Sequence, residues 1–320
     1  MESYHYCTKK DRRDIRNYRP VTLLNSDYKI FTKILTSRLK TVITQLIDPM
    51  QTGFVPGRFI VENSQFMKLL QATLDEKDEP GLLLFLDMEK AFDRVSWEFL
   101  LQALEAMGFG NSGINQDGTT SDNKAEGFTS MVKLMYDSEK PPRRQLHLNG
   151  YKGKWFHLQS GVAQGCPLSP LLFLFVTEGL SRLLNDDPQV EGIIIGEKEV
   201  KFSMFADDTA LCLRSYKSIK RVRRNLKTYE EATGMRVNED KTEGLQMGSL
   251  KKVNPPPELN INWVQEGKYV ISLGIPIGNN FNENEFWETK YTNTKAIMAK
   301  WKYVFGRTTK GRVLISKLMI

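Results

Sequence analysis

Hydrophobic residues recur at helical spacing in several stretches of this chain. Between Asp27 and Ile47 they follow one another mostly at steps of three or four residues, and Pro49 ends the pattern. Such a stripe is typical of an amphipathic helix, and Asp27 can cap its start. The same pattern predicts helices over about 62–74, 95–107, 169–184 (with Ser169 as cap and Pro170 as first helical residue), 219–229 and from Phe286 onward.

Short uninterrupted hydrophobic runs predict strands. The run Leu82–Leu86 suits a strand that is buried on both faces. Two further runs, 201–205 and 210–213, bracket Ala206-Asp207-Asp208-Thr209 and predict a hairpin, and 269–275 predicts another strand. Because strands and helices alternate around a hairpin, we expect an α+β fold with a mixed sheet.

Two stretches interrupt these elements. Residues 111–127 are polar, with Ile114 as the only large aliphatic side chain, which indicates a surface loop or an insertion. Pro255-Pro256-Pro257 indicates a linker. The basic helices that follow are expected to form a separate, smaller lobe.

Composition narrows the class of protein. A length of 320 residues fits two to three domains at roughly 100–200 residues each. With 40% hydrophobic and 26% charged residues, the chain reads as a soluble globular protein, not as collagen, coiled coil, disordered chain or disulfide scaffold. Its apolar runs fall far short of the ~20 residues of a membrane span, and its start lacks a secretory signal. Three scattered cysteines without a CxxC pair favour a reducing, intracellular compartment, and we expect no membrane partner.

The net charge of +7 is unevenly distributed. Seven basic and no acidic residues lie between Arg214 and Lys227, and eight basic and no acidic residues lie from Lys290 to the end. A third basic cluster, between Lys9 and Arg19, is diluted by two aspartates. One such run is often only a solvated helix face, whereas three together favour a groove for a long polyanion.

Three carboxylates have positions that surface charges rarely take. Asp87 directly follows the buried run 82–86, and Asp207 and Asp208 sit together in the tight hairpin. Adjacent acids beside apolar strands are costly unless a cation neutralises them, although Asp207-Asp208 could also be a simple turn dipeptide. Carboxylates are ligands for Mg²⁺, and two such ions about 3.5–4 Å apart can activate a hydroxyl and stabilise a leaving oxygen.

Seven blocks in fixed order cover almost the whole chain: Asp14–Asn25, Gln51–Arg58, Leu86–Asp93, Gly161–Pro170, Phe205–Asp208, Gly234–Thr242 and Tyr269–Gly274. Together they resemble the reverse transcriptase domain of non-LTR (LINE-type) retrotransposons. Group II intron and retron-like enzymes share this outline. The Ala91-Phe92-Asp93 continuation and the tail from Gly306-Arg307 to Gly311-Arg312 are closer to the LINE type.

The resemblance implies the fold of a right-hand polymerase, with an antiparallel sheet and flanking helices in the palm. Fingers would take residues 1–80. The palm would take 81–248, with interleaved fingers elements and the polar insertion near 111–127. The primer-grip region and a truncated, helical thumb would take 249–320. The chain would then be a piece of a longer retrotransposon polyprotein, or a relic of one, and the insertion either a tolerated loop or an artefact of gene prediction.

The implied activity is RNA-directed DNA polymerisation, a nucleotidyl transfer to a primer 3′ end. Asp87, Asp207, Asp208 and the backbone carbonyl of Met88 would hold two Mg²⁺ ions, with Mn²⁺ as an alternative. The partners would be an RNA template, a DNA primer and deoxynucleoside triphosphates. Two other functions stay open. One is a catalytically inactive relic that binds RNA or an RNA/DNA hybrid, and the other is a maturase-type RNA-folding cofactor.

Further roles follow from the resemblance block by block. Phe92 would exclude the 2′-hydroxyl of a ribonucleotide, unless it is simply a core aromatic. Gln164 and Gly165 would line the nucleotide pocket. Arg19 and Arg58 would grip the triphosphate or, alternatively, be solvated or backbone-binding arginines. Lys241 would protonate or neutralise pyrophosphate, unless it is a surface lysine. Leu273 and Gly274 would place the primer backbone, and Asp93 is expected to be a local structural acid.

Overall fold

The computed structural model describes residues 2–7, 13, 18–110, 127–148 and 150–305. The polar stretch expected to form an insertion therefore lies outside the described residues except for Gly127, and so does the 306–312 tail. The chain divides into two compact units, residues 1–263 and 264–320, which are described separately. The expected linker at Pro255–Pro257 lies inside the first unit, ahead of this division.

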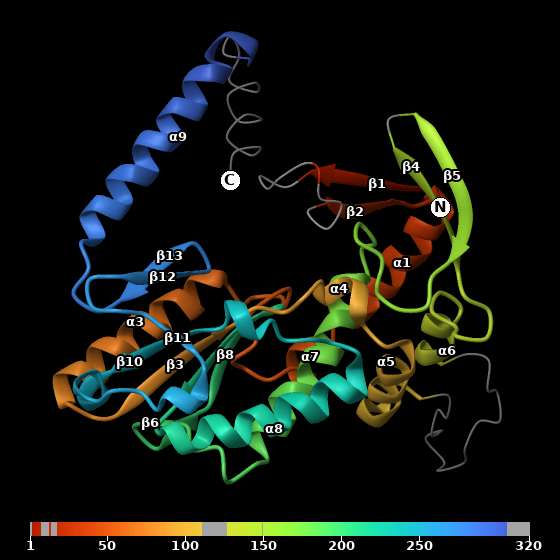
Figure 1. Cartoon of the computed structure of the whole chain (residues 1–320). Coiled ribbons are helices and arrows are strands. Elements are labelled where there is room, and N and C mark those ends of the chain that lie inside the picture. The colour runs from red at the N-terminus through yellow and green to blue at the C-terminus, as the bar shows by residue number, and fades with distance from the viewer. Residues whose placement is uncertain (1, 8–12, 14–17, 111–126, 149, 306–320) are drawn as a thin grey trace. The chain divides into compact units, whose positions relative to one another are not determined.

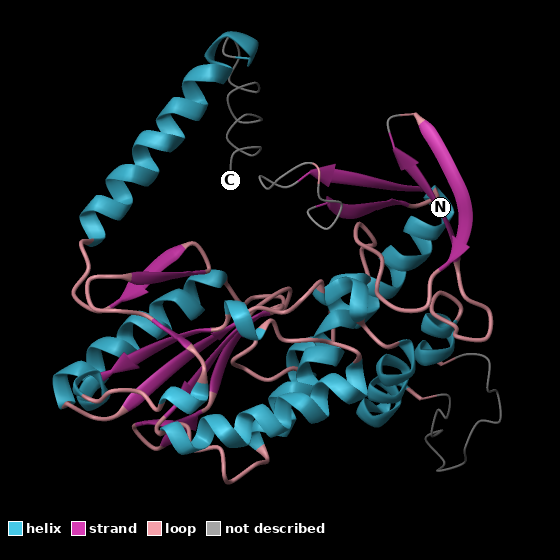
Figure 2. Cartoon of the chain, in the orientation of Figure 1, coloured by secondary structure: helices cyan, strands magenta, loops and turns pink. Residues whose placement is uncertain are grey.

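A five-stranded sheet forms the centre of the first unit (Figures 1 and 2). Its strands are antiparallel except for the β10–β11 pair. In sheet order they are β11 (Asn262–Trp263), β10 (Glu243–Met247), β3 (Gly81–Leu86), β9 (Asp208–Leu213) and β8 (Phe202–Phe205). The hydrophobic run Leu82–Leu86 forms the central strand and is almost entirely buried, as its pattern predicted.

Helices cover both faces of this sheet. Leu84 and Leu86 of β3 face α8 (Tyr216–Thr233), and α7 (Ser169–Asn185) packs in the same core. On the other face, α3 (Ile60–Lys77) contacts β8 and β10. A central strand covered on both sides needs apolar side chains at every position, which explains the uninterrupted run.

Helix α8 has the predicted amphipathic pattern. The hydrophobic residues that it buries against the core are Ile219, Val222, Leu226 and Tyr229. Some of its basic residues are used within the unit: Arg221 pairs with Asp187 at 2.5 Å, and Arg223 donates to the carbonyl of Leu259. Gly234 ends the helix in the left-handed conformation that glycine adopts most easily.

A second, four-stranded sheet has the order β2-β1-β4-β5. Its strands are β1 (Glu2–Cys7), β2 (Tyr18–Leu23), β4 (Arg143–Leu148) and β5 (Tyr151–His157), and β1 and β4 are parallel. Among the described residues of the first unit, the remaining elements are α1 (Ser26–Leu39), α2 (Ile43–Leu46), α4 (Ala91–Arg94), α5 (Trp97–Leu104), a π-helical turn (Glu105–Phe109), α6 (Phe128–Lys133), the β6–β7 hairpin (Ile193–Ile195, Lys198–Val200) and three short 3₁₀ helices (Glu239–Lys241, Gly248–Lys252, Pro257–Leu259).

In its described residues, 264–305, the second unit contains one hairpin and one long helix. Strands β12 (Tyr269–Ser272) and β13 (Ile275–Gly278) pair antiparallel, and α9 (Glu283–Phe305) follows. Leu273 and Gly274 form the two-residue turn, with φ of 50° and 83°. The prediction of one strand over 269–275 is therefore wrong, because two consecutive positive φ angles reverse the chain at its centre.

Other predicted boundaries also change. The helix expected over 27–47 breaks at residues 40–42 into α1 and α2, and the one expected over 95–107 is divided between α5 and the π-helical turn. Ser169 is the first residue of α7 and not its cap, and its hydroxyl lies 3.3 Å from the hydroxyl of Tyr136. None of the helices in the described ranges is both long and apolar enough to cross a membrane.

Candidate active site

The strand register brings the three singled-out carboxylates to one end of the central sheet. Leu86 of β3 pairs with Thr209 of β9, so Asp87, which follows Leu86, lies beside Asp208, which precedes Thr209. Residues paired in this way have Cα atoms about 5 Å apart. Phe205 pairs with Asp208, so that Ala206 and Asp207 alone form the turn, which is tighter than the four-residue turn expected from the sequence.

This end of the sheet carries a concentration of negative charge. Burial, and then the charges of Asp207 and Asp87, raise the pKa of the Asp208 carboxyl above its usual range. Lys241 supplies a cation: its Nζ lies 2.9 Å from Oδ2 of Asp87. The three residues predicted to act together with Lys241 are thus neighbours, and the lysine offsets part of their charge.

The segment that carries Lys241 is attached to the strand end by backbone hydrogen bonds. Asn238 donates its N–H to the carbonyl of Asp87 at 2.8 Å, and Glu89 donates to the carbonyl of Arg236 at 2.8 Å. Met88, the expected backbone ligand, lies between them and forms an isolated antiparallel bridge with Val237. The backbone around Asp87 is therefore held in place by residues 236–238, which lie 147–151 residues further along the chain.

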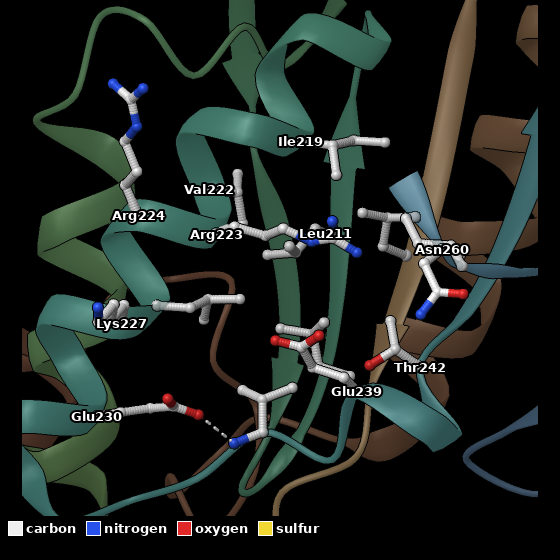
Figure 3. Close-up of a pocket in the computed structure, with 15 residues that line it drawn as sticks. Leu211, Ile219, Val222, Arg223, Arg224, Lys227, Glu230, Glu239, Thr242 and Asn260 are labelled. Atoms are coloured by element: carbon white, nitrogen blue, oxygen red, sulfur yellow. Dashed lines mark hydrogen bonds between the residues drawn. The ribbon is translucent and has the colours of Figure 1, made fainter. Parts of the chain in front are cut away.

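A cavity of about 450 Å³ separates this segment from α8 (Figure 3). Leu84, Leu86 and Leu211 of the sheet line it together with apolar side chains of α8. At its edge, Val237 donates its N–H to Oε1 of Glu230 at 2.6 Å. This bond attaches the segment that carries Lys241 to α8.

The donor set suits a hard divalent cation in charge and atom type, because Mg²⁺ binds carboxylate oxygens. The pKa of Asp208 is raised first by burial and then by repulsion from Asp207 and Asp87, and such a cation would relieve that repulsion. Within the described part of the chain, however, no three His, Cys, Asp or Glu side chains are gathered closely enough to hold a metal. In the structure it is the Lys241 ammonium that contacts Asp87.

Phe92 belongs to a group of aromatic rings near the site. Its ring stacks on that of Phe173, with centroids 4.8 Å apart and planes at 14°, and meets the edge of Phe54 at 6.4 Å. Phe173 is fully buried, whereas Phe54 is 44% exposed. Phe92 therefore lies between the core and an exposed aromatic ring. This position is compatible with both predicted roles, a ring that excludes a 2′-hydroxyl and a core aromatic.

The segment that carries Gln164 and Gly165 is bonded to the segment that carries Phe92. Phe92 accepts a backbone hydrogen bond from Val162 at 2.7 Å, and the Gln164 amide donates to Oδ1 of Asp93 at 3.2 Å. Asp93 therefore orients Gln164, in agreement with a local structural role. Gly165 has a φ of 97°, and a Cβ there would lie 3.1 Å from the carbonyl oxygen of Thr22.

Arg58 has a different environment from the one expected of a triphosphate-binding residue. Its guanidinium donates four hydrogen bonds to backbone carbonyl oxygens, at 2.6–3.1 Å, which belong to Thr44, Ile47, Asp48 and Gln51. These carbonyls include the end of α2, where the helix leaves acceptors without partners. This geometry favours a structural role for Arg58. Arg19 lies in β2, opposite Tyr6.

One residue of the site was missed by the sequence reasoning. Gln51 belongs to the second resembling block, yet no role was expected of it, and its buried side chain contacts Ala206 directly before Asp207. A polar residue in a loop is usually exposed, so nothing local indicated this contact. Leu273 and Gly274 belong to the second unit and are described there by themselves.

Comparison with known proteins identifies the family. The model for "Reverse transcriptase (RNA-dependent DNA polymerase)" matches residues 7–277. The chain belongs to the reverse transcriptase family. Within the domain, the carboxylates, Phe92 and Gln164 all lie in the matched range, and so do Leu273 and Gly274.

The curated relatives of this reverse transcriptase domain are non-LTR retrotransposon proteins. It is 32% identical to the transposon TX1 149 kDa protein of Xenopus laevis, over 98% of the chain and 23% of that protein. It is 26% identical to the Pol polyprotein of retrotransposable element R2DM (71% of the chain, 19% of that protein) and 26% identical to the jockey RNA-directed DNA polymerase (84% and 28%), both of Drosophila melanogaster. The chain thus spans less than a third of the length of these relatives.

Solved telomerase structures share the fold. The telomerase of Candida albicans, in complex with a TWJ fragment of telomeric RNA, matches 91% of the chain and 48% of its own, with a TM-score of 0.52 at 14% identity. A truncated apo telomerase of Candida tropicalis matches 77% of the chain and 50% of its own, with a TM-score of 0.51 at 12% identity. The likeness confirms the expected right-hand polymerase fold.

Proposed function

We propose that this chain is the polymerase core of a non-LTR retrotransposon protein and adds deoxynucleotides to a primer 3′ end on an RNA template. The observation that carries the proposal is the register of β3, β8 and β9. It sets Asp87 beside Asp207 and Asp208 at one end of a buried sheet, where the family's two-metal chemistry needs carboxylates. In this assignment residues 1–80 are fingers, 81–248 palm, and 249–320 primer grip and part of a thumb.

The three aspartates are the proposed ligands of two Mg²⁺ ions, with the Met88 carbonyl as a further ligand. Bound there, such ions lower the pKa of a primer 3′-hydroxyl and offset charge on the departing pyrophosphate. Lys241 pairs with Asp87 in the absence of substrate. It is proposed to donate a proton to the leaving group or to neutralise its negative charge.

The remaining proposed roles concern the substrates. Phe92, whose ring stacks on that of Phe173, would exclude a 2′-hydroxyl. Gln164, which donates a hydrogen bond to Asp93, would contact the incoming nucleotide. Among the two candidate arginines, the carbonyl contacts of Arg58 leave Arg19 as the better candidate for the triphosphate. The Leu273-Gly274 turn is proposed to contact the primer backbone.

Primer extension tests the proposal. The chain is given an RNA template, a DNA primer, deoxynucleotides and Mg²⁺, and is compared with Asp207→Ala and with the matched control Glu76→Ala, an exposed acid on α3. Wild type and Glu76→Ala should extend the primer, and Asp207→Ala should not. Salt-dependent binding of an RNA/DNA hybrid without extension would instead identify an inactive relic. Preference for one structured RNA would favour the maturase-type function.

A further inference from the structure

The side chain of Gln51 bonds to the backbone N–H and to the backbone carbonyl of a single residue in the turn of the β8–β9 hairpin, Ala206. Its Oε1 accepts a hydrogen bond from the N–H of Ala206 at 2.8 Å, and its Nε2 donates to the carbonyl of the same residue at 3.2 Å. Oε1 also accepts from the N–H of Gly53 at 2.9 Å, and Nε2 donates to Oγ1 of Thr177 at 3.4 Å. At 1% exposure, the amide thus uses both lone pairs and both N–H groups within the protein.

Ala206 is a residue whose backbone needs such support. Its φ is 56°, in the left-handed region, which costs a residue with a Cβ roughly 1–2 kcal/mol. It directly precedes Asp207 and Asp208, so the orientation of its peptide sets the direction in which the turn presents both carboxylates. A side chain that bonds to both the N–H and the carbonyl of Ala206 selects this conformation over the extended one.

Gln51 is itself fixed to the hairpin by its neighbours. Thr52 donates its N–H to the carbonyl of Met204, and Met204 donates to the carbonyl of Met50, both at 2.9 Å. Asn63 of α3, which is 3% exposed, donates to the same Met204 carbonyl at 2.9 Å. Residues 50–52 thus lie along β8 like a short parallel strand.

The backbone at Gly53 packs directly against the backbone of Ala206 in the hairpin. A Cβ on Gly53 would come within 2.2 Å of the Ala206 nitrogen, closer than any real contact allows. The contact is therefore between backbones, and the position of Gln51 follows from it.

We propose that Gln51 is a positioning residue: it holds the backbone of Ala206 in the left-handed conformation and thereby orients Asp207 and Asp208 for metal binding. This inference rests on the proposed polymerase function and deepens it. The Gln51 side chain bonds only to protein groups in the structure, and we propose that it acts through the backbone of Ala206. Groups that orient metal ligands in this way usually matter about 10- to 100-fold for metal affinity.

The variant Gln51→Met tests the inference, because it keeps the length of the side chain and removes its four hydrogen bonds. The Mg²⁺ concentration for half-maximal primer extension should rise about tenfold. The affinity for the primer–template duplex should stay the same, because Gln51 is buried away from it. The matched control is Asn225→Ala on α8, where Asn225 is also buried and donates to Asp187 at 2.7 Å. It should lose stability without a change in Mg²⁺ dependence.

A second measurement does not depend on activity. Amide hydrogen exchange of residues 203–209 should speed up by about tenfold or more in Gln51→Met, and stay unchanged in Asn225→Ala, because local opening exposes the Ala206 N–H. If wild type extends no primer, the proposed function fails while this measurement still decides on Gln51. Unchanged exchange, or an unchanged Mg²⁺ requirement in an active protein, overturns the inference. If Gln51→Met does not fold, Gln51→Asn, which withdraws the amide by one methylene, should shift both readouts in the same direction.

Discussion

Replacing Arg58 by methionine should destabilise the domain and leave nucleotide affinity unchanged. The substitution removes four hydrogen bonds to the carbonyls of Thr44, Ile47, Asp48 and Gln51. Bonds to a charged group contribute about 1.5 kcal/mol each at the low end, but three of these four are only partly buried and one is exposed. Ordering the arginine costs up to about 2 kcal/mol, so the expected net loss is about 2–4 kcal/mol.

Urea unfolding of wild type, Arg58→Met and Arg58→Lys measures this loss, alongside the KM for a deoxynucleotide. Lysine cannot form the fork that reaches several carbonyls at once, so Arg58→Lys should recover only a small part of the stability. The control is Arg38→Met, which removes an exposed arginine of α1. The structural role of Arg58 is refuted if stability is unchanged and the KM rises about tenfold, a loss of about 1.4 kcal/mol in binding, because the guanidinium would then serve the triphosphate.

Three further substitutions test the site. Asp208→Asn should abolish extension yet stabilise the metal-free protein. Because the pKa of Asp208 is raised in the folded state, wild-type stability falls as pH rises through that pKa. Urea unfolding in EDTA should therefore show the variant to be more stable than wild type at pH 7 but not at pH 3. Phe92→Ala should reduce discrimination against ribonucleotides by about 10- to 100-fold in competing extension assays, and unchanged selectivity would leave Phe92 as a core aromatic. Gly53→Ala should cost about 1–3 kcal/mol in thermal unfolding, because its Cβ would overlap Ala206; equal stability would show that the segment can move aside.

Local pattern was enough to predict the elements that carry the chemistry. The uninterrupted run 82–86 predicted a strand buried on both faces, and the structure makes it the central strand of the sheet. The 3-4-3 spacing of apolar residues predicted the buried face of α8. A strand buried on both faces must be apolar throughout, and a helix that packs on a core must be apolar along one face. Both requirements appear directly in the spacing of hydrophobic residues along the sequence.

Exact boundaries depended on backbone conformations that the sequence indicates weakly. Leu273 adopts a positive φ and turns a predicted strand into a hairpin, although leucine disfavours that region. The helix expected over 27–47 breaks at 40–42, where no proline or glycine marks the break. Such positions are decided by what the flanking segments pack against.

The sequence by itself determined which residues could do the chemistry: the acids that end buried strands, and the blocks that place this chain among reverse transcriptases. Only the tertiary structure decided how those residues are held. In the structure, the Arg58 guanidinium donates to four backbone carbonyls and Lys241 pairs with Asp87. Gln51 bonds to the backbone of Ala206, 155 residues further along the chain. Hydrogen bonds between distant segments leave no periodic trace in the chain, since a polar side chain in a loop looks the same whether it faces water or a buried backbone.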